Sequence, residues 1–380
     1  MSAGDESKQE RGACGVCLRR SWLLSALGGP LDYCARDRSR LLELLALSDE
    51  QLLAAVAGRR KAELEAAYAR FDAAELEREA REQTICRHRR GYPHALHGRS
   101  SPHMLTVRGG AGRLAKLTAA PAVAILGSAV PSDYGRETAR SLARGLAASG
   151  VTVVTALSDG IAAAAQAGAL EAGAGSIAVL SGGLDVSCPP RRRPLYERIG
   201  RDGCLVSELP LDCAGRRWGQ RASERIIVEL APVSVIVEAE QTPRGMAAAS
   251  TARELGRPVA AIPGRVTSAL SRGTNALLMD GASLVRGPRD VLELLFELSG
   301  ARPKAGPTEA VAAGAVRPTR LRPTLERVLE RVSAGYDTPD KLTRAGVDVR
   351  QVLPALTELE LAGLLSRGDG GRYLPREPLD

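Results

Sequence analysis

Small and hydroxylated residues follow an apolar run in the stretch Pro121–Gly135 (PAVAILGSAVPSDYG), and their order suits the binding of an anion. Val123–Leu126 predicts a short buried strand, Gly127 and Ser128 end it, and a helical pattern begins near Tyr134. A strand, a small-residue turn and a helix N-terminus direct backbone N–H groups and the positive end of a helix dipole at one point. The stretch holds neither a G-x-G-x-x-G motif nor a P-loop, so it predicts a phosphate-type turn without specifying a nucleotide.

Three further apolar runs end in small residues, and together the four ends favour a binding crevice. The alternative is that each glycine only permits a tight turn between a strand and a helix. Asp159 and Glu208 also lie near strand ends, but Glu208 suits a capping or loop-orienting role better than acid–base catalysis. The three further ends are Ser158-Asp159-Gly160, Gly182-Gly183 and Pro263-Gly264.

The chain has seven cysteines, an odd number that argues against a disulfide framework. Cys14-x-x-Cys17, with Cys34, Cys86 and His88, offers the residue types of a zinc site. The second half lacks the usual paired spacing, and Cys34 would have to supply a ligand from a separate helix. We therefore expect ordinary reduced thiols near a small helical core, and neither a metal nor a cofactor.

The elements that position the strand ends form an α/β domain. Continuous apolar runs that alternate with helical segments predict a mainly parallel sheet buried on both faces, in a Rossmann-like doubly wound arrangement. Such sheets bind ligands at the carboxyl ends of their strands. The expected strands lie within residues 123–126, 151–157, 176–183, 203–209, 233–240 and 258–264.

Length and composition limit the class of protein. A chain of 380 residues holds two or three domains. No stretch is long and apolar enough to span a membrane, and the first residues lack the apolar segment of a signal peptide, so the expected compartment is the cytoplasm. A net charge of +8 permits nucleic acid as a partner, whereas an aromatic content of only 3% argues against a typical base-stacking platform.

Four segments are expected along the chain. Residues 1–95 are helical, residues 96–300 form the α/β domain, residues 301–317 are a linker rich in Pro, Ala and Gly, and residues 318–380 form a compact module. In the first segment, a long charged helix is expected from about Arg60 to Arg81.

The two flanking segments each leave two interpretations open. Ser25–Tyr33 (SALGGPLDY) has the glycine turn of a phosphate-gripping helix–hairpin–helix unit or is a plain helical turn, which we favour. The C-terminal module, with three helices and a hairpin, predicts a winged helix. Its third helix offers only Arg350 as a cation that could reach bases, so protein docking is favoured over DNA reading.

The motifs and their order resemble the DNA-processing protein family DprA, also called Smf. GSAVPSDYG resembles the family's GSR-x-x-x-x-YG turn, and IAVLSGGLDVSCPP is similar to IAVL-x-x-G-x-D-x-x-YPP. RIIVELAPVSVIVEAE is similar to RNRIIAGLS-x-x-x-VVEA. AIPGRVTSALSRGTNALLMDGA resembles VPG-x-x-x-S-x-x-S-x-G-x-N-x-L-x-x-DGA. The resemblance covers nearly the whole chain.

The resemblance implies a binding protein rather than an enzyme. Members bind single-stranded DNA, act as dimers, and help to load the recombinase RecA during natural transformation and homologous recombination. Carried over residue by residue, the family's basic pocket at the strand ends implies DNA contacts here. The implied residues are Gly127, Ser128, Tyr134, Gly135, Gly160, Gly182, Arg225, Arg244, Gly264, Ser271, Arg272, Gly273 and Asn275.

Several loop positions depart from the family pattern, which predicts weaker DNA binding. The arginine that follows Gly-Ser in the family is Ala129 here, and an Arg-Asn pair is replaced by Ser223-Glu224. Each lost charge-assisted contact costs about 1.5–3 kcal/mol. Arg225, Arg272 and the run Arg191–Arg193 are expected to compensate in part. The other departures are Ala156, Ala162, Gln166, Pro243 and Ala248.

Two other function classes remain open at this point. The first is a degenerate paralogue that acts as a protein-interaction scaffold without strong DNA binding, as the changes at Ala129, Ser223 and Glu224 suggest. The second is a sensor or enzyme for a nucleotide-derived ligand, since Rossmann-like crevices also bind such molecules.

Overall fold

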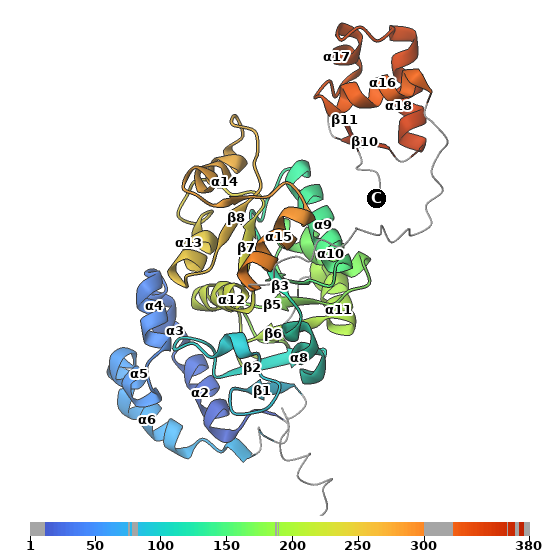
Figure 1. Cartoon of the computed structure of the whole chain (residues 1–380). Helices are drawn as coiled ribbons and strands as arrows, with labels where there is room; N and C mark the ends of the chain where they lie inside the picture. Colours follow the sequence, from blue (N-terminus) through green and yellow to red (C-terminus); the bar gives the residue numbers. More distant parts are fainter. Residues whose placement is uncertain are drawn as a thin grey trace, which may run out of the picture. The chain divides into compact units, whose positions relative to one another are not determined.

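The computed structural model describes residues 12–74, 77, 83–186, 188, 190–299, 322–362, 364–368 and 372–375. It divides into two compact units, Met1–Arg302 and Pro303–Asp380 (Figure 1). The expected linker at residues 301–317 lies outside the described residues. No helix within the described ranges is long and apolar enough to cross a membrane.

The first unit is built on a nine-stranded sheet with the order β1-β2-β6-β5-β4-β3-β7-β8-β9. β2 pairs antiparallel with both of its neighbours, and every other pair is parallel. The strands are β1 (Thr84–Cys86), β2 (Met104–Arg108), β3 (Ala122–Leu126), β4 (Thr152–Ala156), β5 (Ser176–Val179), β6 (Cys204–Ser207), β7 (Val233–Ile236), β8 (Val259–Ala261) and β9 (Ser283–Leu284). The six predicted strands are confirmed, and the strand order reverses beside β3.

Helices cover both faces of this sheet, as the continuous apolar runs predict. Along β3, Ala122, Ala124 and Leu126 join the core on one face, while Val123 and Ile125 join the core on the other. The first core includes residues of α8 (Ala111–Ala119), α12 (Arg217–Leu230), α13 (Ala247–Glu254) and α14 (Ala269–Met279). The second includes residues of α9 (Asp133–Ala148), α10 (Ile161–Glu171) and α15 (Pro288–Ser299), and α11 (Arg193–Asp202) packs through a smaller cluster.

The N-terminal helices belong to the same unit and pack against it through Leu209, Cys213 and Trp218. The expected boundary at residue 95 is too late, because β1 already joins the sheet at Thr84. The long helix expected up to Arg81 is also wrong: α6 ends at Arg70, and Phe71 is extended. The helices are α2 (Gly15–Ala26), α3 (Gly28–Cys34), α4 (Arg38–Leu45), α5 (Asp49–Val56) and α6 (Lys61–Arg70), with 3-10 turns at Gly58–Arg60, His94–Leu96 and Pro190–Arg192.

The second unit is a winged helix, as predicted. α16 (Pro323–Ser333), α17 (Pro339–Arg344) and α18 (Val349–Leu361) enclose a core with the hairpin β10 (Leu365–Gly368) and β11 (Arg372–Pro375). The hairpin register pairs Leu365 with Pro375. The hairpin turn at residues 369–371 and the side chain of Arg350 lie outside what the structure describes.

Candidate nucleic-acid interface at the strand ends

The carboxyl ends of β3 to β8 meet at one edge of the sheet, because these strands are parallel. Backbone hydrogen bonds join neighbouring loops along this edge. Ser128 N–H donates to the Glu238 carbonyl (2.8 Å), Ile161 N–H donates to the Ser128 carbonyl (3.1 Å), and Gly183 N–H donates to the Cys213 carbonyl (2.8 Å). Apart from the buried Arg225, the predicted residues lie on or next to the loops at this edge, which we call the ledge of strand ends. The reversal of strand order between β4 and β7 lies at its centre.

The N-terminus of α9, where an external phosphate was expected, already holds a carboxylate of the chain. Glu238 is only 2% exposed, and its Oε2 accepts from the backbone N–H of Ser132 at 2.9 Å. Ser132 Oγ donates to Glu238 Oε1 (2.5 Å) and accepts from Gly135 N–H (3.1 Å). A Cβ on Gly135 would lie 2.2 Å from that carboxylate. The expectation of an open anion site at this helix end is thus wrong.

The loop after β4 is shaped by Gly160 and neutralised by arginines. Gly160 has φ +76°, and a Cβ there would meet the Ser128 carbonyl oxygen at 2.4 Å. Asp159 accepts from Arg192 (2.7 and 2.8 Å) and pairs with Arg191 at 2.7 Å. The hydrogen bond from Arg192 lowers the pKa of Asp159 below its usual value. One carboxylate thus engages two of the three arginines in the run Arg191–Arg193.

Arg225 is not available to DNA, which corrects the sequence prediction. Its side chain is 0% exposed and pairs with Glu208, itself 5% exposed, at 2.5 Å. A second guanidinium nitrogen donates to the Ser100 carbonyl. The pair joins α12 to the loop after β6, so Arg225 is a structural residue. Glu208 holds this loop, in agreement with the orienting role expected for it.

The loop after β8 is held by α14 and leaves one predicted cation exposed. Asn275 donates from Nδ2 to the Gly264 carbonyl and accepts from Gly264 N–H, both at 3.1 Å. Ser271 and Gly273 are buried against neighbouring loops, and Arg272 is exposed. These residues therefore shape the loop, while Arg272 is placed to contact a ligand.

Tyr134 and four arginines supply exposed groups along the ledge. Tyr134 is 50% exposed, with its hydroxyl 3.3 Å from the Pro263 carbonyl oxygen. Arg244 and Arg265 are exposed on the loops after β7 and β8. Within the described part of the chain, no carboxylate pairs with the four arginines Arg217, Arg244, Arg265 and Arg272.

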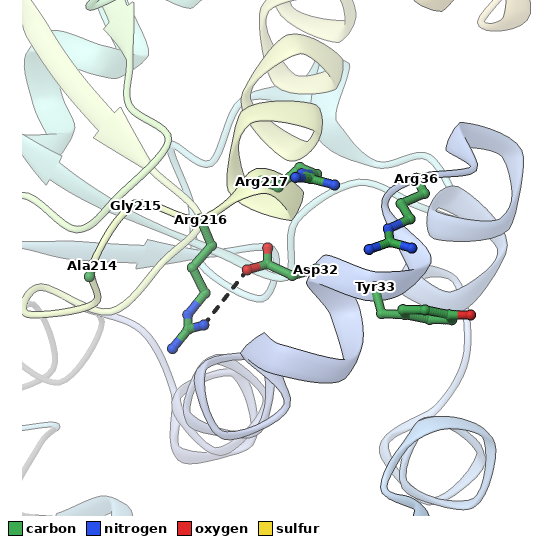
Figure 2. Close-up of a pocket in the computed structure, with 7 residues that line it drawn as sticks. All are labelled: Asp32, Tyr33, Arg36, Ala214, Gly215, Arg216 and Arg217. Atoms are coloured by element: carbon green, nitrogen blue, oxygen red, sulfur yellow. Dashed lines mark ion pairs between the residues drawn. The ribbon is translucent and has the colours of Figure 1, made fainter.

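An open pocket of about 660 Å³ adjoins the loop after β6, and sequence reasoning missed it. Figure 2 shows three arginines in the pocket with Asp32: Arg36 in the turn after α3, and Arg216 and Arg217 at the start of α12. Asp32 accepts from Trp218 N–H (2.9 Å) and lies 3.7 Å from the Arg216 guanidinium. Tyr33 is 66% exposed, with the Arg36 guanidinium 5.0 Å from its ring centre.

The pocket adds a cationic patch with an aromatic ring to the ledge. Its lining holds three arginines and one carboxylate, and two of these arginines stand at the positive end of the 14-residue helix α12. Gly28 permits this packing, since a Cβ there would lie 2.9 Å from Arg216 Nε. The adjacent arginines 216 and 217 are visible in the sequence, but only the fold brings α3 beside them. Ser25–Tyr33 is a helical junction between α2 and α3, the plainer of the two interpretations.

Comparisons with known proteins agree with this architecture. The family model described as DNA recombination-mediator protein A matches residues 83–296, and the DprA winged helix domain matches residues 312–371. A relative in Mycobacterium tuberculosis (strain H37Rv), which is named as a DNA processing protein DprA, is 36% identical over 254 residues. The match covers 66% of this chain and 63% of the relative. Protein Smf of Escherichia coli (strain K12) is 34% identical over 252 residues, 66% of each chain. The chain thus spans less than two thirds of these relatives' length.

Two solved structures share the fold. DNA processing protein A of Streptococcus pneumoniae is similar with a TM-score of 0.57 and 30% identity, over 65% of this chain and 86% of that one. The protein from Helicobacter pylori, whose structure concerns its single-stranded DNA binding mode, gives a TM-score of 0.50 and 26% identity, over 59% of this chain and 99% of that one. Since the first family model covers more than half of the chain, the protein belongs to the DprA/Smf family of DNA-processing proteins.

Proposed function

We propose that this chain binds single-stranded DNA, without reading its sequence, along the ledge of strand ends. The observation that carries the proposal is the row of exposed arginines on that ledge: Arg217, Arg244, Arg265 and Arg272. Guanidinium groups hold phosphates by charge and paired hydrogen bonds, which carry no base information. The binding mode named for the Helicobacter pylori relative supports the same ligand class.

The two exposed tyrosines give this surface a second kind of contact. Tyr33 lies in the arginine pocket and Tyr134 lies in the first turn of α9, both at the same edge of the sheet. A base stacked on an aromatic ring contributes about 1–3 kcal/mol, whichever base it is. Stacking on rings and pairing with arginines together suit a flexible single strand better than a duplex, whose bases are covered.

The implied family contacts divide into two roles. Gly127, Ser128, Gly135, Gly160, Gly182, Gly264, Ser271, Gly273 and Asn275 shape the loops, whereas Tyr134, Arg244 and Arg272 meet DNA. Arg225 is left out because it is buried. The shaping role follows from close packing: a Cβ on Gly127 would lie 2.8 Å from the Glu238 carbonyl oxygen.

The carboxylates at the strand ends support a binding role rather than an enzymatic one. Asp159 pairs with arginines, Glu208 pairs with Arg225, and Glu238 accepts from Ser132. Each carboxylate is held by a partner within the chain.

We infer a homodimer in the cytoplasm that helps to load RecA in homologous recombination and natural transformation. The support for these four points is membership of the family.

The direct test is fluorescence anisotropy of labelled oligonucleotides with the full chain at low salt. The wild type is expected to bind oligo-dT and a mixed sequence with similar affinity. The triple variant Arg217→Ala, Arg244→Ala, Arg272→Ala should bind at least tenfold more weakly, because the loss of even one contact costs about 1.5–3 kcal/mol. Arg201→Ala is the matched control, because Arg201 is exposed at the end of α11, at the opposite edge of the sheet.

Absence of binding by the folded wild type would overturn the proposal. The scaffold alternative would then take its place, and the filled helix end at Glu238 would be its first support. Equal weakening per charge removed in Arg201→Ala and in the triple variant would mean that general charge, rather than the ledge, holds the DNA.

A further inference from the structure

Three cysteines and a histidine from two distant segments meet at one point beside the sheet. The ligand atoms of Cys14, Cys17, Cys86 and His88 all lie within 4.8 Å of one another. His88 Nδ1 is 3.3 Å from Cys14 Sγ and 3.4 Å from Cys17 Sγ, and the sulfurs of Cys14 and Cys86 are 3.8 Å apart. None of these four residues is among the proposed DNA contacts.

The three individual distances, 3.3, 3.4 and 3.8 Å, are close to those of a tetrahedral zinc shell. Zn–S bonds of about 2.3 Å and Zn–N bonds of about 2.0–2.1 Å place two sulfurs about 3.8 Å apart, and a sulfur and a nitrogen about 3.5 Å apart. Three thiolates and one imidazole are also a donor set that zinc takes in structural sites. Cys34, the ligand that the sequence suggested, lies instead in the core of the N-terminal helices.

The backbone builds this cluster from two local turns. Cys14 is the N-cap of α2, so Cys17 follows one helical turn later on the same side. Cys86 ends β1, and Arg89 N–H donates to its carbonyl (2.9 Å) in the turn that presents His88. Cys14 N–H approaches Cys86 Sγ at 3.4 Å, a contact that favours a thiolate. The spacing is therefore Cys-x-x-Cys followed by Cys-x-His.

We propose that Cys14, Cys17, Cys86 and His88 bind one structural Zn²⁺ ion that fastens α2 to the edge strand β1. Four protein ligands complete a tetrahedral shell and leave no position for substrate, so the site is structural rather than catalytic. Binding releases the protons of the three thiols to solvent. The tie closes a long stretch of chain, from Cys14 to Cys86, and this stretch contains Tyr33 and Arg36 of the arginine pocket.

The test uses the full chain purified under reducing conditions without chelator. Elemental analysis by inductively coupled plasma mass spectrometry should find one zinc per chain. Cys17→Ser and Cys86→Ser should lose most of it, whereas Cys188→Ser, at a half-buried cysteine outside the cluster, should keep it. A chelator should lower the melting temperature of the wild type and of Cys188→Ser, with little effect on Cys86→Ser.

Cobalt substitution keeps the proposal testable even where a variant fails to fold. Apo wild type titrated with Co²⁺ should show the intense visible bands of a tetrahedral site and the sulfur-to-metal charge-transfer bands of its thiolates. Folded wild type that holds no zinc and gives no such spectrum would overturn the proposal. So would a Cys14–Cys86 disulfide found by mass spectrometry in the protein as purified, or equal zinc loss in Cys188→Ser.

Discussion

Replacement of Arg225 by alanine should damage stability rather than DNA contact. The Arg225 guanidinium is fully buried and 2.5 Å from Glu208, and its other bond goes to the Ser100 carbonyl. Removal of one partner leaves the Glu208 carboxylate buried without its counter-charge, which costs about 3–5 kcal/mol. For a domain of this size, that corresponds to a fall in melting temperature of roughly 10 °C.

The assay pairs urea unfolding followed by circular dichroism with DNA binding measured where the variant is still folded. Arg225→Ala should unfold at lower urea concentration and, while folded, bind oligo-dT as the wild type does. Arg244→Ala should behave in the opposite way, because Arg244 is exposed on a loop. Unchanged stability of Arg225→Ala with lost DNA binding would refute the reasoning, since it would mean that the guanidinium reaches the ligand.

Three further predictions follow from single contacts. Gly135→Ala should destabilise the fold by more than about 1 kcal/mol, because its Cβ would clash with the buried carboxylate of Glu238. The control Gly112→Ala, at a helical glycine where a Cβ would meet nothing within 4 Å, should stabilise the fold by about 0.5–1 kcal/mol, and thermal melts test both variants. Asp159→Asn should free Arg192 and its neighbour for phosphate and make the salt dependence of DNA binding steeper, by up to about 1.4 in log–log slope. Burial raises the pKa of Glu229 in the folded state, so the folded chain binds more protons than the unfolded chain. The free energy of unfolding should therefore fall as pH rises above the unfolded pKa of this carboxyl, and Glu229→Gln should flatten that fall in thermal melts across pH.

The α/β core was predictable because its signal is local. Runs such as Val123–Leu126 are apolar without alternation, which is typical of strands buried on both faces. The winged helix was predictable for a similar reason: each of its helices, and its hairpin, is formed by one short continuous segment of the sequence. The edge strands β1 and β9 and the inner strand β2 were missed, because β1 and β9 have only three and two residues and are defined by their pairing with a neighbouring strand.

The errors at the candidate site share one cause: the deciding partner is distant in sequence. The sequence predicts an accessible cation at Arg225, because it does not show that the fold brings Glu208 and Ser100 beside it. The sequence predicts an open anion site at the turn around Ser132, because the residue that fills it, Glu238, lies 106 residues further along the chain. The proximity of Cys86 and His88 to Cys14 is equally hard to predict, because the sequence does not show that β1 ends beside α2.

The measurement that tests the central claim most directly is the salt dependence of oligo-dT binding by the wild type and the triple variant at Arg217, Arg244 and Arg272. Each arginine that meets a phosphate of a single strand contributes about 0.7 to the slope of log affinity against log salt. If all three do so at the ledge, the slope of the variant should be shallower by about 2. The same slope in both proteins would contradict the account, since the phosphates would then be held elsewhere on the chain.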